Sequence, residues 1–248
     1  AFTILHDGFA KLNNVNWKAA GVAIPVFSLR SKKSFGTGEF TDLNLLVDWA
    51  KTTGLKMIQL LPVNDTTATY SWKDSYPYSA ISAFALHPLL LNIETVAGKE
   101  KAEVATALSS KQEQLNKLPE LDYEEVIKIK IEAISKLYHL QKTDFKDDLK
   151  FMNFFEFNRH WLEPYAAFSY LRDKYKTADF TTWKTNAVYD ESEIQQLVSP
   201  VQKHYDEIAV HYFTQYHLHL QLKAATEYAH KNGIIIKGDI PIGICRNS

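Results

Sequence analysis

The sequence predicts an α/β fold with a parallel sheet, and three short apolar segments support this prediction. Residues 21–29 (GVAIPVFSL), 56–62 (KMIQLLP) and 234–236 (III) are mainly apolar runs, each followed by polar residues. Uninterrupted runs of this length are typical of strands that are covered on both faces, as in parallel sheets wrapped by helices. We expect the wholly β-branched run at 234–236 to be a central strand.

A helical pattern connects the first two predicted strands. Apolar residues recur at the spacing of one helix face, at Leu43, Leu46, Val47 and Ala50. Gly54 then stands where helices commonly end in the left-handed backbone conformation. Strand, helix and strand in this order predict one βαβ unit.

Residues 64–199 show no further apolar strand and instead predict a large, mainly helical insertion. Helical patterns cover 99–118, 124–140, 151–161 and 164–175, with Pro164 in the first turn of the last helix. The aromatic residues of the third helix predict a buried face: Phe151, Phe154, Phe155, Phe157 and Trp161. Ser199 and Pro200 indicate the N-cap and first residue of a long helix that Gly233 closes.

Composition and charge exclude several classes of partner. The chain of 248 residues is 46% hydrophobic and 23% charged, which is ordinary for a protein with a sizeable core. A formal net charge of -1 gives no electrostatic reason to expect nucleic acid or an anionic membrane. No apolar run approaches the roughly twenty residues that cross a bilayer, and no leader-like segment opens the chain. The single cysteine, Cys245, cannot form an internal disulfide, which favours a cytoplasmic location.

The histidines of the long predicted helix do not have the spacing of a metal site. They are His204, His211, His217 and His219. Metal ligands on one helix face are three or four residues apart, and neither the first pair nor the last pair has this separation. We therefore predict no metal site.

Polar residues after the predicted strands form a candidate ligand site. Asp239 follows the third strand, and Asn64 and the aromatic loop 66–88 follow the second. In parallel α/β proteins, ligands bind outside the carboxyl ends of the strands. A carboxylate at this point can also merely stabilise a turn, and the residues alone leave both interpretations open. The glycine loop at 34–38 lacks the spacing of a phosphate-binding loop.

Several motifs, in one order along the chain, carry a resemblance to a known family. They are GVAIPVFSLRS, FGTGEFTDLNLLVDWA, QLLPVNDT, DSYPYSAISAFALHP, WLEPYAAFSYLRD, QYHLHLQLKAA and GDIPIGICRNS. Together they resemble the 4-α-glucanotransferases of glycoside hydrolase family 77, which include amylomaltase and the disproportionating enzymes. The motifs look most similar to the longer subtype of plant cytosol and some bacteria.

The resemblance implies the amino-terminal part of a (β/α)8 TIM barrel with a large, mainly helical insertion after strand 2. Residues 1–63 would hold strands 1 and 2 and the first helix. Residues 64–199 would form the aromatic loop and the helical insertion, and 200–248 the long helix and strand 3. The implied reaction transfers α-1,4-glucan segments between maltooligosaccharides or glucans by retaining double displacement. No metal or organic cofactor is implied.

The resemblance places the reacting carboxylates beyond Ser248, the last residue of this sequence. The family's nucleophile follows the fourth strand in an arginine-x-aspartate-histidine string, which does not occur here, and its acid/base glutamate follows the fifth strand. We therefore expect no catalytic residue in this chain and no activity from the chain alone. The missing carboxyl-terminal half of the barrel would be required.

The resemblance also implies substrate-binding residues at matched motif positions. Asp239 in GDIPIG matches an aspartate that organises the site around the scissile sugar. Tyr78 in DSYPYSAISAF matches a tyrosine that stacks on the glucosyl unit at the cleavage point, for which an aromatic face is apt. Asn64, Asp74 and Ser75 would contact sugar hydroxyls. We expect Tyr78 and Asp239 to lie beside each other in one sugar cleft.

Two other functions remain open. The chain could be a non-catalytic α-glucan-binding fragment, which its 13% aromatic content would suit. It could also be part of an α-amylase-type hydrolase, which would share the barrel and the retaining chemistry.

Overall fold

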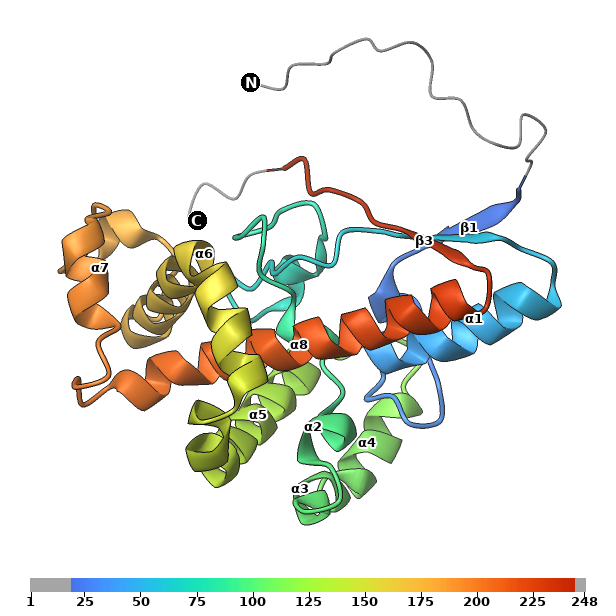
Figure 1. Cartoon of the computed structure of the whole chain (residues 1–248), viewed down its shortest axis with the longest axis horizontal. Helices are drawn as coiled ribbons and strands as arrows, with labels where there is room; N and C mark the ends of the chain where they lie inside the picture. The colour runs from blue at the N-terminus through green and yellow to red at the C-terminus, as the bar shows by residue number, and fades with distance from the viewer. Residues whose placement is uncertain (1–18, 244–248) are drawn as a thin grey trace, which may run out of the picture.

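The computed structural model describes residues 19–243 and contains a parallel three-stranded sheet in the order β1-β2-β3 (Figure 1). The strands are β1 (Gly21–Ile24), β2 (Met57–Leu60) and β3 (Ile235–Lys237). The predicted α/β class with a parallel sheet is confirmed, but the strands are shorter than the apolar runs. β1 ends before Pro25, which has no N–H to extend the ladder, and the 3-10 turn Val26–Ser28 follows.

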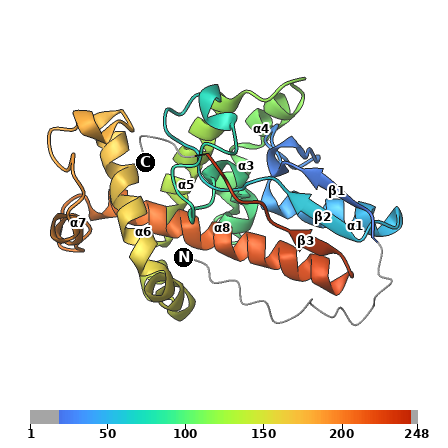
Figure 2. The ribbon, with the colours of Figure 1, turned by 90° about the horizontal axis from the view of Figure 1, so that it is seen from above.

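Within residues 19–243 the central strand is β2, so the expected central place for residues 234–236 is not met in this part of the chain. Val22 lies opposite Ile58, which in turn lies opposite Ile236, and this row faces the covering helices. Those helices are α1 (Leu43–Thr52) and α8 (Tyr205–Lys231), which lie side by side on one face of the sheet (Figures 1 and 2).

The opposite face of the sheet is exposed in the described part of the chain. Its central row contains Ala23, Gln59 and Lys237, and the Lys237 Nζ donates to Gln59 Oε1 at 3.2 Å. The side chain of Ile235, on the same face, is 44% exposed. The expectation of cover on both faces is therefore not met by residues 19–243.

The helices between β2 and α8 make up most of the molecule. Their bounds are α2 (Ile93–Ala97), α3 (Ala102–Thr106), α4 (Ser109–Asn116), α5 (Tyr123–Lys146), α6 (Leu149–Tyr175) and α7 (Glu191–Leu197). Short 3-10 segments occur at Phe40–Asp42, Trp72–Ser75, Pro88–Leu90 and Phe180–Thr182. The single helix predicted for 99–118 is thus divided into α3 and α4.

The prediction of a new helix at Pro164 is wrong, because α6 continues through this proline. Proline removes one backbone hydrogen bond from a helix interior. The neighbouring side chains of Leu162 and Tyr165 are buried, and their packing offsets this loss. The predicted aromatic face is confirmed for Phe151, which is buried, and wrong for Phe157, whose side chain is 83% exposed.

The predicted start of the last long helix is also wrong. Ser199 and Pro200 lie in a turn, and α8 begins at Tyr205. The His204 ring stacks on Tyr170 of α6 with centroids 4.8 Å apart, and its Nε2 lies 3.0 Å from the Leu197 carbonyl oxygen. Packing of His204 therefore fixes the turn that precedes α8.

Glycines end two helices as predicted. Gly54 and Gly233 have φ angles of 77° and 73°, the left-handed region that favours glycine. Both positions lead directly into a strand, β2 and β3 respectively.

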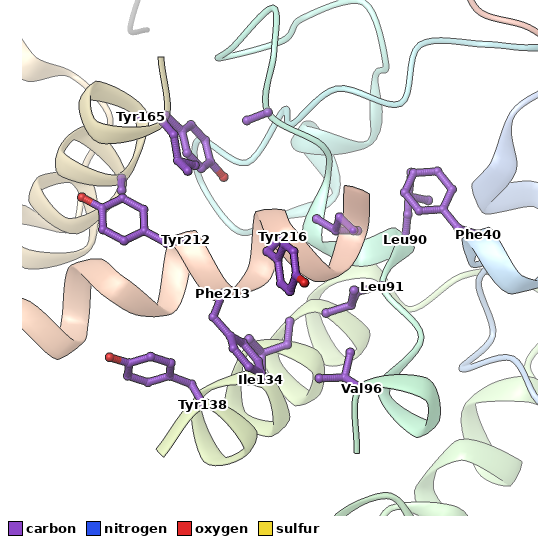
Figure 3. Close-up of a cluster of buried hydrophobic side chains, with 14 of the residues drawn as sticks. Phe40, Leu90, Leu91, Val96, Ile134, Tyr138, Tyr165, Tyr212, Phe213 and Tyr216 are labelled. Atoms are coloured by element: carbon purple, nitrogen blue, oxygen red, sulfur yellow. The ribbon is translucent and has the colours of Figure 1, made fainter. Parts of the chain in front are cut away.

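The aromatic residues of α8 lie at the centre of the core. Tyr212, Phe213 and Tyr216 pack against side chains of α5 and α6 and of the segment before α2 (Figure 3). The other labelled members of the cluster are Phe40, Leu90, Leu91, Val96, Ile134, Tyr138 and Tyr165. The carboxyl-terminal part of α8 instead packs on the sheet, so one helix joins the helical part to the strands. Within residues 19–243, none of the helices combines the length and apolarity needed to span a bilayer.

Candidate functional site

Tyr78 and Asp239 meet where the loop after β2 crosses the segment after β3. The Tyr78 hydroxyl donates to Asp239 Oδ2 at 3.0 Å, and the Ile240 N–H donates to Oδ1 at 3.0 Å. Both side chains are half-buried, so the remaining acceptor sites of the carboxylate are open to a ligand. The expected proximity of Tyr78 and Asp239 is confirmed by this hydrogen bond.

A second contact fixes the same crossing. A Cβ atom added at Gly243 would lie 2.3 Å from the Tyr78 carbonyl oxygen, closer than any side chain tolerates. Only glycine allows the two backbones to approach in this way. The segment after β3 is therefore held against Tyr78 at both its side chain and its backbone.

The Tyr78 hydroxyl stays protonated over the usual pH range. Its hydrogen bond to the Asp239 carboxylate raises the pKa of Tyr78 above the ordinary tyrosine value. The ring lies next to that of Tyr76, with centroids 5.7 Å apart and an interplanar angle of 50°. The Tyr76 side chain is 60% exposed, so aromatic surface is available beside Asp239.

Asp74 is placed to organise the loop. Its carboxylate is buried and accepts hydrogen bonds from the Thr69 hydroxyl at 3.0 Å and from the N–H groups of Thr69 and Tyr70 at 2.8 and 2.6 Å. Its own carbonyl oxygen accepts a hydrogen bond from the Thr66 hydroxyl. The sequence-based role as a sugar contact stays untested, and these bonds direct the carboxylate into the loop.

Asn64, Asp74 and Ser75 line one small cavity of about 30 Å³, together with His87 and Tyr123. This volume suits about one or two water molecules. Tyr78 and Asp239 do not line it, so the predicted site residues form two groups. Asn64 also forms an isolated antiparallel bridge with Leu86, and Ser75 is exposed.

Sequence reasoning missed His87 and Tyr123. The Tyr123 hydroxyl and His87 Nε2 are 3.3 Å apart, and burial lowers the pKa of His87 so that its ring is neutral at pH 7. The only sequence signal was the position of His87 at the end of the DSYPYSAISAFALHP motif.

A buried polar network on α6 was also missed. Arg172 donates from Nη1 to the Thr67 carbonyl oxygen at 2.7 Å and from Nη2 to the Tyr70 hydroxyl. The Tyr165 hydroxyl donates to Asp65 Oδ2 at 2.7 Å. These bonds attach the loop after β2 to a helix that lies far along the chain.

His211 and His217 of α8 lie in packed surroundings, whereas His219 is exposed. Burial lowers the pKa of both His211 and His217 to about 4, so both rings are neutral at pH 7. Among residues 19–243, no group of three or more His, Cys, Asp or Glu side chains is arranged to hold a metal ion.

Two residues that the sequence predictions depend on lie outside the described residues. Cys245 is the basis of the predicted location, and Ser248 is the residue beyond which the nucleophile and the acid/base are expected. The structure describes no residue after Gly243, so it tests neither expectation. Both the cytoplasmic location and the placement of the reacting carboxylates beyond Ser248 stay predictions.

Comparison with solved structures defines the class of fold. The chain superposes on an amylomaltase from Streptococcus agalactiae in complex with acarbose with a TM-score of 0.71 and 23% identity, covering 92% of this chain and 44% of that one. An amylomaltase from Corynebacterium glutamicum gives a TM-score of 0.65 at 16% identity, covering 91% of this chain and 30% of that one. The fold is therefore an α/β fold similar to that of the amylomaltases.

Sequence comparison gives the family. The model of glycoside hydrolase family 77, described as 4-alpha-glucanotransferase, matches residues 24–248, and the chain belongs to this family. A 4-alpha-glucanotransferase from Oryza sativa subsp. japonica is 42% identical over 247 residues, covering 100% of this chain and 26% of the relative. One from Chlamydia trachomatis is 34% identical over 229 residues, covering 92% of this chain and 42% of the relative. The chain thus spans less than half the length of each of these relatives.

Proposed function

We propose that this chain is the amino-terminal part of a 4-α-glucanotransferase that passes α-1,4-glucan segments between maltooligosaccharides or glucans. The observation that carries the proposal is the hydrogen bond between Tyr78 and Asp239, which joins two motifs of the family at one point. An aromatic ring beside a half-open carboxylate suits a sugar, because the ring packs on the C–H face and the carboxylate accepts from hydroxyls.

The sheet supports a barrel in the whole protein. Its strands are parallel, α1 and α8 cover one face, and the row Ala23, Gln59 and Lys237 lies on the other. In the proposed (β/α)8 barrel this row points inward, and α2 to α7 form the insertion after strand 2. The outer edges of β1 and β3 and the exposed face would then be covered by the remaining strands.

The reaction would be retaining double displacement, with the nucleophile and the acid/base supplied from beyond Ser248. Tyr78 would stack on the glucosyl unit at the cleavage point, and Asp239 would accept a hydrogen bond from its hydroxyls. Asn64 and Ser75 would contact further hydroxyls, and Asp74 would hold the loop that carries them. No cofactor, metal or nucleic acid enters this scheme, and the chain alone would be inactive. A cytoplasmic location stays a prediction.

Asp239→Asn in the full-length protein tests the proposal. We expect the rate of transfer between maltooligosaccharides to fall about a hundredfold, because a charge-assisted hydrogen bond to substrate is lost. Asp144→Asn, an exposed position on α5, is the matched control and should transfer normally. Undiminished transfer by Asp239→Asn would remove the role proposed for this carboxylate.

Product analysis separates the transferase from an α-amylase-type hydrolase. A transferase lengthens some oligosaccharides while it shortens others, whereas a hydrolase only shortens them. Incubation of the full-length protein with maltotriose should therefore give longer products as well as shorter ones. Shortened products alone would favour the hydrolase.

One feature favours a binding function of this chain by itself. A cavity of about 590 Å³ opens beside the Tyr70 ring, and its lining includes the charged residues Glu132, Arg172, Asp173 and Lys176. Its size suits one or two sugar units. Calorimetric titration of the isolated chain with maltooligosaccharides tests this candidate: saturable binding by a folded monomer would favour it, whereas aggregation of the chain would favour the amino-terminal part of a barrel.

A further inference from the structure

The loop after β2 that carries Tyr78 is closed at its base. The Asp65 N–H donates to the Ala85 carbonyl oxygen at 2.8 Å, and the Ile81 N–H donates to the Asp65 carbonyl oxygen at 2.8 Å. These bonds bring the two ends of the loop together, so residues 65–85 form one excursion from the fold. Tyr78 lies on the returning arm of this loop.

Arg172 of α6 holds the outgoing arm of the loop. Its side chain is only 4% exposed, and its Nη1 and Nη2 groups donate to the Thr67 carbonyl oxygen and the Tyr70 hydroxyl. The guanidinium also lies over the Tyr70 ring, 4.8 Å from the centroid. Its Nε donates to Asp173 Oδ1 at 2.8 Å. A planar, forked group is required to make these contacts at once.

The conformation of Tyr70 shows how strongly this arm is constrained. Tyr70 has a φ angle of 57°, which is costly for a bulky residue and persists only where surrounding contacts impose it. Arg172 donates a hydrogen bond to the Tyr70 hydroxyl, and Asp74 Oδ2 accepts one from the Tyr70 N–H at 2.6 Å. The turn Trp72–Ser75 that contains Asp74 is thereby fixed relative to α6.

The fixed turn leads directly to Tyr78. Only Tyr76 and Pro77 separate it from Tyr78, and the Ser79 N–H donates to the Tyr76 carbonyl oxygen at 3.2 Å. The position of Tyr78 beside Asp239 therefore depends on a series of contacts that begins at Arg172. Tyr165, two turns earlier on α6, holds the base of the same loop through Asp65.

We propose that Arg172 is a positioning residue, which holds the loop 65–85 on α6 and thereby sets Tyr78 against Asp239. Its effect on transfer rests on the proposed function, whereas its effect on the loop does not. The substrate does not contact Arg172 in this scheme. The guanidinium acts through the backbone of Thr67 and the side chain of Tyr70.

Hydrogen exchange tests the effect on the loop. Arg172→Lys keeps the charge but removes the forked geometry, and we expect backbone exchange at residues 66–78 to rise about tenfold in the full-length protein. Arg159→Lys is the matched control, because Arg159 lies on the same helix and binds Glu163 one turn away. Exchange in the loop should be unchanged in that variant. Equal exchange in wild type and Arg172→Lys would overturn the proposal.

Kinetics test the link to Tyr78. We expect Arg172→Lys to raise KM for a maltooligosaccharide donor about tenfold and to change kcat by less than about threefold, because stacking contributes to ground-state and transition-state binding alike. In a Tyr78→Ala background, Arg172→Lys should have little further effect on KM, because both substitutions weaken the same stacking of Tyr78 on the substrate. An undiminished effect in that background would overturn the proposal.

A third variant, Tyr70→Phe, keeps the proposal testable if Arg172→Lys fails to fold. If Arg172→Lys does not fold, Tyr70→Phe deletes a single hydroxyl from the same contact and should still raise loop exchange by about threefold. Unchanged exchange in this variant would also overturn the proposal. An absence of transfer by the wild-type protein would remove the proposed function, while the exchange measurements would still decide the role of Arg172.

Discussion

Lys130 of α5 and Glu39, which precedes the Phe40–Asp42 turn, form an ion pair with Nζ and Oε1 2.5 Å apart and with side chains 0% and 1% exposed. The Lys130 ammonium also donates to the carbonyl oxygens of Leu89 and Leu91, which uses all its donors. Glu39 accepts a second hydrogen bond, from the Asn92 amide at 2.6 Å. The pair therefore joins α5 to the segments before α1 and α2.

Removal of one member of this pair should destabilise the protein strongly. Lys130→Met leaves the Glu39 carboxylate buried without its cation, and we expect a loss of about 3–5 kcal/mol in the free energy of unfolding. Urea denaturation monitored by circular dichroism measures the loss. The double variant with Glu39→Gln should recover part of it.

The loss in Lys130→Met should also depend on pH. Burial raises the pKa of Glu39 in the native protein, and removal of Lys130 raises it further. A carboxyl whose pKa is raised in the folded state binds its proton more tightly in that state than in the unfolded chain. The loss in free energy of unfolding caused by Lys130→Met therefore shrinks as pH falls. Lys223→Met, from an exposed pair with Glu227, is the control and should cost less than about 0.5 kcal/mol. A pH-independent loss would contradict the assignment to Glu39.

Lys130 also shows what a sequence pattern cannot reveal. The helical pattern at 124–140 has Ile127, Ile131, Ile134 and Tyr138 on one apolar stripe, and these side chains are buried or partly buried. A lysine beside such a stripe ordinarily reaches solvent. Lys130 is buried only because Glu39, 91 residues earlier, lies opposite it, and no local pattern records that pairing.

Local features, and those that lie in the family's motifs, could be predicted from the sequence, whereas contacts between distant residues could not. The strands, α1 and the proximity of Tyr78 to Asp239 follow from apolar runs, helical periodicity and matched motifs. The contact of Arg172 with Tyr70 joins residues 102 positions apart, and neither stands in a periodic pattern that indicates the other. The prediction of a helix start at Pro164 failed because burial of the neighbouring side chains Leu162 and Tyr165 keeps this proline inside α6.

Asp206 should give a measurable acid dependence of stability. Its carboxylate accepts from Lys142 at 2.5 Å and from the Tyr138 hydroxyl at 2.8 Å, and these contacts lower the pKa of Asp206 to about 2. The folded pKa lies below the unfolded value, so the stabilisation is present above about pH 4 and is lost as pH falls towards 2.

Asp206→Asn tests this dependence. The Asp206 side chain is about one third exposed, so we expect a cost of only about 1 kcal/mol at pH 7. The difference in stability between Asp206→Asn and the wild type should narrow between pH 4 and pH 2, as measured by thermal unfolding. Asp144→Asn, on the exposed surface of α5, should show no such narrowing. A difference that stayed constant to pH 2 would contradict the assignment.

Tyr78→Phe separates the ring of Tyr78 from its hydroxyl. Phenylalanine keeps the aromatic face but loses the hydrogen bond to Asp239, so we expect kcat/KM of the full-length protein to fall only about fivefold. Tyr78→Ala, which also loses the face, should reduce kcat/KM by about a hundredfold. Tyr76→Phe is the control and should behave as wild type. Equal losses in the two Tyr78 variants would mean that the hydroxyl, and not the ring, carries the function.

Gly243→Ala should separate the segment after β3 from Tyr78 without touching either side chain of the pair. The added Cβ would lie 2.3 Å from the Tyr78 carbonyl oxygen, so one backbone must move and the hydrogen bond to Asp239 must lengthen or break. We expect kcat/KM to fall at least tenfold in the full-length protein, because displacement of a binding group by about 1 Å has a large effect on rate.

The matched control for this variant lies five residues earlier in the same segment. Gly238→Ala places its Cβ where no atom lies within 4 Å, so it changes the same residue type without a collision. Its kcat/KM should stay within about twofold of wild type. If both alanine variants lost activity equally, flexibility of the whole segment would be the cause, because the close approach exists only at Gly243. If neither lost activity, the crossing of the two segments would not set the geometry of the site.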